Sequence, residues 1–325
     1  MNEIKRKSAD QLNYVALAGG VGGAKLAHGL AALLPPEQLT IVVNTGDDMQ
    51  YMGLQVCPDV DTVLYTLSGW ANTQSGWGVA GDTFNNLGAL AALDVDHWFR
   101  IGDKDLATHM LRTLLLESGL TLTQVTAELA RRMGIAHPIL PMSDAPYPTL
   151  LETNQGVLDF QVYFVKNHCE PVIKRIFWND GKEGQASPQV MLALNEADCV
   201  ILCPSNPFVS IDPILSLKGV RDLLRERFCM ALSPIIQGKA LKGPAAKMFS
   251  ELGVVPSAHA VADYYKDFVS LFFVDELDQA EMAAIAELDM AVEAIPSIMP
   301  TLKERKQTAS LMLDSFFQHF TGVST

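Results

Sequence analysis

Two short segments rich in aspartate carry the side chains of this chain that are best suited to bind a metal ion. Asn44–Asp48 directly follows the apolar run Ile41–Val43, and Pro58–Thr62 lies ten residues further on. Ionised carboxylates are not buried without partners, and an α/β protein places ligands just after its strands. Mg²⁺ prefers carboxylate oxygens when it also holds a phosphate. We therefore predict a phosphate-and-metal site with Asp48 and Asp61 as magnesium ligands, although either could instead accept a proton.

A strand, a glycine loop, a helix and a second strand follow one another near the start of the chain. We expect the first strand at Tyr14–Ala18, the loop at Gly19–Lys25, the helix from about Lys25 to Leu34 and the second strand at Leu39–Val43. This order predicts a right-handed βαβ unit.

The glycine loop matches neither of two common nucleotide-binding patterns in full. Gly20 and Gly22 fit the dinucleotide pattern, but Lys25 replaces its third glycine, and Asn44 stands where an acid would hold an NAD ribose. No Gly-Lys-Ser/Thr follows, so the loop is not a P-loop. We expect these four residues to bind a phosphate or nucleotide at a helix start. The pattern argues against an NAD-dependent oxidoreductase; a tight turn without a ligand is the alternative.

Strands and helices continue to alternate along the rest of the chain. Strands are expected at 98–101, 150–165 with a hairpin turn at 154–156, 199–202, 230–232 and 268–274, and helices at about 105–116 and 303–320. This rhythm predicts an α/β protein with a Rossmann-like, mostly parallel sheet and helices on both faces. We expect a loose lead-in at 1–12 and a single domain at 13–325, with an inserted α+β lobe at about 105–185.

Polar residues stand after several of the expected strands. They are Arg100, Ser143, Asp144, Ser205, Asn206 and Ser233. An open α/β sheet binds ligands along the carboxyl edge of its strands, so we expect these residues to share one site. Taken singly, each fits a simple turn or a surface salt bridge equally well. His109 is expected to be structural, and Trp70 and Trp77 are expected to pack in the core.

Composition narrows the class of protein. The chain has 325 residues, 49% of them hydrophobic, and a net charge of -13 without any basic run. These values argue against a nucleic-acid partner, and no apolar stretch is long enough to span a bilayer. The five scattered cysteines are typical of a reduced, cytoplasmic protein. The sequence leaves a homodimer open.

Seven motifs, taken in order, resemble the 2-phospho-L-lactate transferase family of coenzyme F-420 biosynthesis. They are Gly19–Lys25, Val43–Asp48, Pro58–Thr66, Arg100–Asp105, Pro141–Asp144, Pro204–Pro207 and Ser233–Ile235. The resemblance extends over nearly the whole chain from about Tyr14. One departure is Cys203, which stands where a glycine is expected and would either crowd a ligand or face the sheet.

The resemblance implies a Mg²⁺-dependent cytoplasmic transferase. Such an enzyme moves a phospholactyl, phosphoenolpyruvyl or phosphoglyceryl group from a guanosine-diphosphate-activated donor to the ribitol hydroxyl of the deazaflavin Fo, and releases GMP. Asp61 and Arg100 would contact Fo, with Ser143 and Asp144 beside them. The nucleotide would lie on the Gly20–Gly22 loop and on the later turns at Ser205, Asn206 and Ser233. The alternative is a nucleotide-sugar-binding regulatory protein of a related Rossmann-like family, which the Asp59–Thr62 and Arg100 motifs disfavour.

Overall fold

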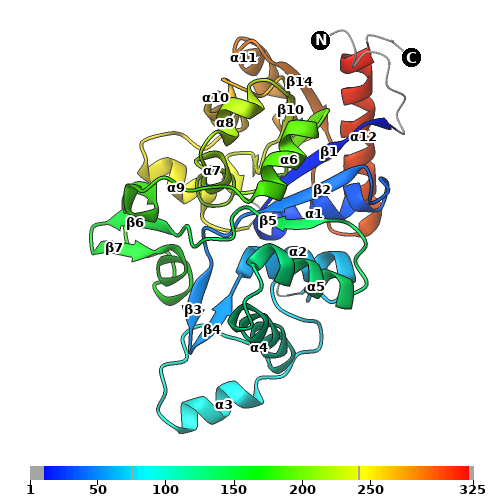
Figure 1. Cartoon of the computed structure of the whole chain (residues 1–325). Coiled ribbons are helices and arrows are strands. Elements are labelled where there is room, and N and C mark those ends of the chain that lie inside the picture. Colours follow the sequence, from blue (N-terminus) through cyan, green and yellow to red (C-terminus); the bar gives the residue numbers. More distant parts are fainter. Residues whose placement is uncertain (1–10, 75, 241, 322–325) are drawn as a thin grey trace.

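Seven parallel strands form the central sheet, in the order β14-β13-β10-β9-β1-β2-β5 (Figure 1). The structure is a computed structural model that describes residues 11–74, 76–240 and 242–321. The strands are β1 (Tyr14–Ala18), β2 (Leu39–Val43), β5 (Ile139–Pro141), β9 (Cys199–Leu202), β10 (Phe228–Leu232), β13 (Leu271–Asp275) and β14 (Ala291–Ile295). The expected parallel sheet is confirmed. Residues 1–10 of the expected lead-in lie outside the described part of the chain, and Leu12 is buried.

Side chains of β1 alternate between two hydrophobic cores, one on each face of the sheet. Val15 and Leu17 belong to one core, and Tyr14, Ala16 and Ala18 belong to the other. The first core is covered by α6 (Pro188–Glu196), α8 (Val220–Leu224), α10 (Ala258–Tyr265) and α11 (Met282–Ala286). The second is covered by α1 (Gly20–Ala31), α2 (Pro58–Ser68), α5 (Leu122–Arg132) and α12 (Leu302–Thr321). Helices therefore cover both faces, as the sequence predicts.

The order of the strands fixes where a ligand can bind. From β1 the chain moves to β2 and later β5 on one side, whereas β9 pairs with the other side of β1 and leads outward to β10, β13 and β14. The direction of winding therefore reverses between β1 and β9. In open α/β sheets the crevice outside the carboxyl ends of the strands at such a point is the usual ligand site.

Several elements lie outside the central sheet. The hairpin of β3 (Met49–Tyr51) and β4 (Leu54–Val56) is followed by α3 (Asn85–Ala92) and α4 (Asp103–Glu117). A separate antiparallel sheet has the order β7-β6-β8 and consists of β6 (Thr149–Thr153), β7 (Gly156–Asp159) and β8 (Ile173–Trp178). Its first hairpin turns at 154–155, close to the expected position. This sheet lies inside the expected lobe at 105–185, whereas β3, β4 and α3 precede that range.

Shorter elements surround the carboxyl edge and the lobe. They are η3 (Val162–Lys166), η4 (Asn179–Gly181), η5 (Pro207–Ile211), α7 (Asp212–Leu215), β11 (Ile235–Ile236), β12 (Lys239–Ala240), α9 (Ala245–Glu251) and η6 (Glu276–Glu281). No helix in the described ranges is long and apolar enough to cross a membrane.

The strand expected at 98–101 is wrong, because this segment is irregular. Its aromatic residues pack against the β3–β4 hairpin instead of joining a sheet. The ring centroids of Tyr51 and Trp98 lie 5.5 Å apart, and those of Tyr51 and Phe99 lie 5.8 Å apart. An apolar run thus indicated burial correctly and secondary structure incorrectly.

Two further expectations about local structure are corrected. Helix α1 begins at Gly20 and not near Lys25, so the glycine-rich segment forms the first turns of the helix. Trp70 and Trp77 were expected in the core, but each is 46% exposed. Both lie in the loop between α2 and α3.

Helices α3 and α4 are joined by carboxylates at their N-termini. The Asp103 carboxylate accepts hydrogen bonds from the backbone N–H groups of Asn85 and Asn86, both at 3.0 Å. In return, Asp82 accepts from the backbone N–H of Lys104 at 2.8 Å. These bonds satisfy amides that a helix start leaves without partners. They matter here because α3 itself has no buried residue.

We predict that Gly29→Ala destabilises the fold. Helices α1 and α12 pack so closely that a Cβ at Gly29 would overlap the backbone carbonyl of Arg305. Urea unfolding should show a loss of about 1–3 kcal/mol, as for overpacked cores. The matched control is Gly88→Ala in α3, where nothing lies within 4 Å of the added methyl. That control should be neutral or gain up to about 1 kcal/mol; equal losses in both variants would contradict the packing argument.

Candidate functional site

Asp59 joins the three segments that meet at the switch point. Its Oδ1 accepts a hydrogen bond of 2.6 Å from the backbone N–H of Gly20, and its Oδ2 accepts one of 2.9 Å from Asn44 Nδ2. Gly20 has a φ of +60°, a left-handed conformation that favours glycine. The Asp59 carboxylate therefore already satisfies one helix-start amide that the sequence assigns to a phosphate.

The remaining glycines of the motif allow α1 to approach the turn after β9. A Cβ at Gly22 would overlap the carbonyl oxygen of Pro204, and a Cβ at Gly23 would overlap Ser205 Oγ. The same Ser205 hydroxyl accepts a hydrogen bond of 3.1 Å from the Gly19 N–H. Gly22 is thus required for packing whether or not a ligand binds.

Other residues predicted for the nucleotide site use their polar atoms within the protein. Asn44 is fully buried, and its Oδ1 accepts from the Gly46 N–H at 2.8 Å. Ser233 Oγ donates to the carbonyl of Ile235, and Asn206 Oδ1 accepts from the Phe208 N–H. These side chains build the carboxyl edge, and ligand contacts would come from the surfaces that they shape.

Three carboxylates crowd together at the end of β2. Burial is the main cause that raises the pKa of Asp47, and the charges of Asp59 and Asp48 raise it further. Burial likewise raises the pKa of Asp48, against the lowering effects of the Cys57 thiol and of Arg112. Burial also raises the pKa of Asp59 to about 6, against the effect of its two hydrogen bonds. Asp48 Oδ1 is enclosed and has no hydrogen-bond partner. Negative charge is therefore concentrated where a cation or a proton would be stabilised.

A cavity of about 500 Å³ opens beside these acids. Its wall is built by the β2–β3 turn, the segment after β5, and the end of β7 with the residues that follow it. Residues that line it include Asp48, Asp144, Tyr147, Thr149, Phe160 and Gln161. Gln161 also donates to Asp47 at 3.0 Å. The cavity thus combines apolar and aromatic surface with a few carboxylates, as small-molecule sites do.

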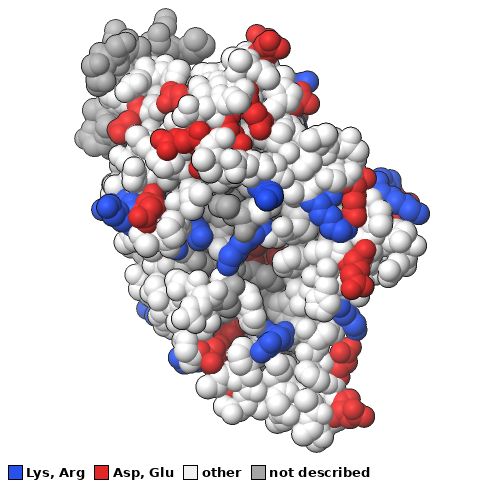
Figure 2. Space-filling model, turned by 180° about the vertical axis from the view of Figure 1, so that it is seen from behind, with Lys and Arg blue, Asp and Glu red and all other residues white. Residues whose placement is uncertain are grey.

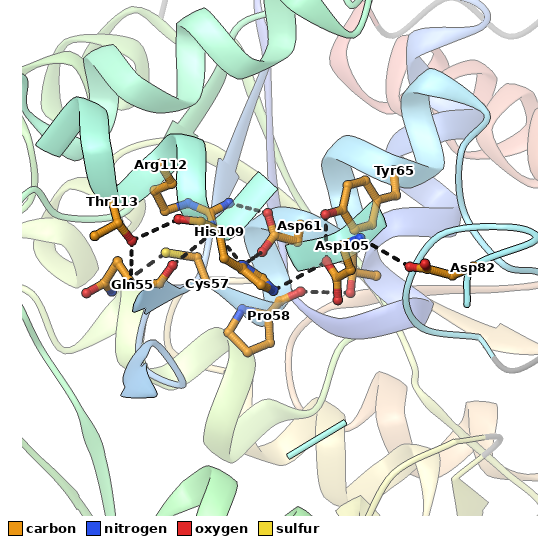
Figure 3. A network of polar contacts seen from close by, with 11 residues as sticks. Gln55, Cys57, Pro58, Asp61, Tyr65, Asp82, Asp105, His109, Arg112 and Thr113 are labelled. Carbon is orange, nitrogen blue, oxygen red and sulfur yellow. Dashed lines mark hydrogen bonds and ion pairs between the residues drawn. The ribbon is translucent and has the colours of Figure 1, made fainter. Parts of the chain in front are cut away.

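Asp61 faces α4 and belongs to a buried network with Arg112 and His109 (Figure 3). The Arg112 guanidinium forms an ion pair with Asp61 Oδ1 and donates to His109 Nδ1 at 3.1 Å. Arg112 is completely buried, and Asp61 raises the pKa of its guanidinium although burial opposes this. The negative charge of Asp61 therefore has a cation partner, whereas Asp48 has none in contact.

His109 extends the network to Asp105 (Figure 3). Its Nε2 lies 3.3 Å from Asp105 Oδ1, which also accepts a hydrogen bond of 2.7 Å from the Tyr65 hydroxyl. Burial alone would raise the pKa of Asp105, but the contact with His109 and the Tyr65 hydrogen bond lower it overall. Ligand atoms of Asp61, Asp105 and His109 lie within 4.8 Å of one another, close enough to hold a metal ion. Because Arg112 already supplies positive charge there, this cluster needs a cation less than the acids at the end of β2 do.

The structure separates the residues predicted to contact Fo. Asp144 lines the cavity and accepts from the Thr123 N–H at 2.7 Å, while Ser143 is buried beneath it. Arg100 does not follow a strand: it is exposed, and its guanidinium lies 4.9 Å from the centre of the Phe84 ring. Asp61 is enclosed against α4.

Lys25 and Cys203 are the last two positions that the sequence analysis singled out. Lys25 is partly buried near the start of α1. Cys203 belongs to the hydrophobic core beneath α1, so it faces the sheet and does not crowd a ligand.

Sequence reasoning missed Arg112 and treated His109 as an isolated residue. Asp105, His109 and Arg112 are spaced by four and three positions along α4, which places them on one face of the helix. That spacing was the available signal, but only the tertiary structure shows that the face points at Asp61.

An open parallel sheet with an acidic cavity beside its switch point defines a Rossmann-like ligand-binding protein. Comparison with known proteins then gives its family, because residues 14–296 match the family described as 2-phospho-L-lactate transferase CofD. The chain belongs to this family, and it is therefore a transferase that acts on small molecules.

Similar proteins carry two different names. A 2-phospho-L-lactate transferase from Methanosarcina barkeri is 38% identical over 93% of this chain and 98% of the relative. A phosphoenolpyruvate transferase from Kitasatospora aureofaciens is 37% identical over 93% of this chain and 97% of the relative. Among solved structures, a UPF0052 family member from Bacillus halodurans has a TM-score of 0.61 at 15% identity, covering 93% of this chain and 100% of that one. That likeness supports the fold alone.

We predict that Arg112→Met costs about 3–5 kcal/mol of stability, because it leaves Asp61 buried without its cation partner. Urea unfolding at pH 7.5 would measure the loss. The double variant Arg112→Met with Asp61→Asn removes the charge as well and should recover part of it. Additive losses in this double-mutant cycle would show that the two side chains do not interact.

Proposed function

We propose that this protein transfers a phospho-acid group to the ribitol hydroxyl of the deazaflavin Fo. The donor is the guanosine-diphosphate-activated form of phospholactate, phosphoenolpyruvate or phosphoglycerate, and the products are GMP and a precursor of coenzyme F-420. The single observation that carries the proposal is membership of the transferase family over most of the chain. The acidic cavity beside Asp48 supports it, because its volume of about 500 Å³ has room for a small molecule.

Magnesium is part of the proposal, with Asp48 and Asp61 as its predicted ligands. The acids at the end of β2 fit such an ion: they are crowded oxygen donors, and the enclosed Asp48 Oδ1 lacks any partner. Asp61 would have to exchange or share its contact with Arg112. A bound Mg²⁺ would neutralise charge on the transferring phosphate.

Proton removal from the acceptor hydroxyl falls to a carboxylate of the same site. Asp48 is suited to this role because its raised pKa brings it nearer to the pH at which a general base works best. Asp48 and Asp61 remain alternative candidates for the base. The cavity aromatics and Asp144 would orient the flat deazaflavin.

The decisive experiment is turnover with purified protein, Fo, Mg²⁺ and each of the three activated donors in turn. We expect GMP release that requires Fo, with one donor favoured. Relatives with two names differ by only one percentage point in identity, so similarity does not choose the donor. Absence of transfer with all three donors would overturn the proposal.

Location in the cytoplasm and assembly as a homodimer are also part of the proposal. All five cysteines are free thiols, which suits the reducing cytoplasm. Met110 and Leu114 of α4 are 56% and 63% exposed, an apolar surface that would suit a homodimer. Light scattering of the purified protein would test this assembly.

We predict that Asp48→Asn stabilises the protein while abolishing most of its activity. The folded state raises the pKa of Asp48, so its ionised form is unfavourable there and stability rises as the pH falls. The variant should therefore be more stable than the wild type at pH 7.5. This gain should shrink toward pH 4, as wild-type Asp48 becomes protonated in the unfolded chain too. Turnover should fall about 100-fold or more.

Asp144→Asn is the matched control for the stability measurement, because it is exposed and an asparagine also caps a helix. It should change stability by less than about 0.5 kcal/mol. A destabilised Asp48→Asn protein would contradict the electrostatic argument.

We predict that Arg100→Lys weakens the binding of Fo more than the binding of the nucleotide. A guanidinium can stack on a flat heterocycle, as Arg100 does on Phe84, whereas lysine does so poorly. The apparent Fo affinity should fall tenfold or more, and donor affinity should hardly change. Kinetics at varied Fo and donor concentrations would measure both. Equal losses of affinity for the two ligands would show that Arg100 does not recognise Fo specifically.

A further inference from the structure

Two buried or partly buried cations between α1 and α12 have no carboxylate partner among the described residues. Several other cations of this strongly anionic protein pair with acids, as Arg131 does with Glu128 and Arg221 with Asp267. The Lys25 ammonium, by contrast, forms no hydrogen bond or ion pair with any residue in the described ranges. Arg305 is only 9% exposed. A buried charge without a counter-ion is costly, so this exception needs a physical reason.

Arg305 has few partners. Its Nη1 donates to His28 Nδ1 at 2.9 Å, and its Nε is enclosed without a hydrogen-bond partner. Nδ1 can accept this bond only when it carries a lone pair, and His28 then has no charge that could balance the charge of Arg305. Arg305 also lies in the first turn of α12, where the helix dipole disfavours a cation.

Both cations belong to one seam between α1 and α12. The helices touch at Gly29, next to the His28 contact of Arg305. Lys25 lies one turn closer to the glycine loop, and burial together with Arg305 and Lys242 lowers its pKa. Lysine and arginine side chains border a hollow on the face shown in Figure 2. Lys25 therefore lies between the helix start at Gly20, whose amide Asp59 already satisfies, and the His28 contact of Arg305.

We propose that Lys25 and Arg305 form an anion site on the α1–α12 seam that binds the phosphate oxygens of a diphosphate ester. This inference deepens the proposed function and rests on it, since the ester would be the activated donor. The planar guanidinium offers several N–H groups to phosphate oxygens, and the lysine adds a second positive charge. Sequence reasoning could name Lys25 in the glycine motif but had no reason to join it to a residue 280 positions away.

Inorganic pyrophosphate is the probe for this site. Calorimetry with the full chain should show binding that weakens as salt is raised from 50 to 200 mM. Lys25→Met should reduce the affinity at least tenfold. Arg305→Met should do the same, and Arg305→Lys should lose less. Lys303→Met is the matched control: it removes an exposed cation from the same turn of α12 and should bind pyrophosphate like the wild type.

Kinetics distinguish failure of this inference from failure of the proposed function. If the inference holds, the donor KM rises at least tenfold in Lys25→Met while the Fo KM is unchanged. Wild-type affinity for pyrophosphate in Lys25→Met, or an equal loss in Lys303→Met, would overturn the inference even if Fo is turned over. Binding that depends on both cations without any transfer to Fo would overturn the proposed function alone. If Arg305→Met fails to fold, as circular dichroism would show, the Lys25→Met result decides.

Discussion

The carboxylate of Asp59 holds the start of α1, the end of β2 and the first turn of α2 in one place. It does so with two hydrogen bonds, from the Gly20 N–H and from Asn44 Nδ2. Asn44 in turn reaches the carbonyl of Val209 at 3.1 Å, on the far side of the switch point. Because the donors are neutral, they orient the carboxylate without cancelling its charge. The same arrangement that orders the backbone therefore creates the electrostatic field of the site.

Two acids that look equivalent in the sequence acquire different environments from this arrangement. Asp61 lies three residues after Pro58 in α2 and is balanced by Arg112 of α4, so it stabilises the contact between two helices. Asp48 lies in a turn and makes no ion pair, although each of the two acids has one enclosed oxygen without a hydrogen-bond partner, Asp48 Oδ1 and Asp61 Oδ2. Buried polar groups are normally satisfied, and exceptions gather at functional sites because folding alone does not require them. The structure thus separates an acid that has a clear role in stability from one that has none.

The sequence predicted five of the seven central strands because these are short, mostly apolar runs that end in polar turns. β1, β2 and β9 have the expected bounds. The irregular segment at 98–101 was misjudged because its two aromatic residues and Ile101 also form an apolar run, and only packing on Tyr51 decides its shape. The early start of α1 was missed because its glycines suggest a loop, whereas Asp59 caps them into a helix.

Among the site residues, Asp48 and Lys25 could be named from local motifs. Arg112 and Arg305 could not, because their importance depends on neighbours that are distant in the sequence.

Helix α3 stands apart from both hydrophobic cores, at the lower end of the molecule in Figure 1. It buries no residue, and carboxylate caps at Asp82 and Asp103 hold its start and that of α4 in water-exposed positions. Its local opening therefore removes almost no apolar surface from contact with the protein. Such an opening is governed by a few solvent-exposed hydrogen bonds and is separate from global unfolding. The amides of α3 should consequently exchange with solvent hydrogen as an independent unit, while those of the parallel sheet exchange only when the whole domain opens.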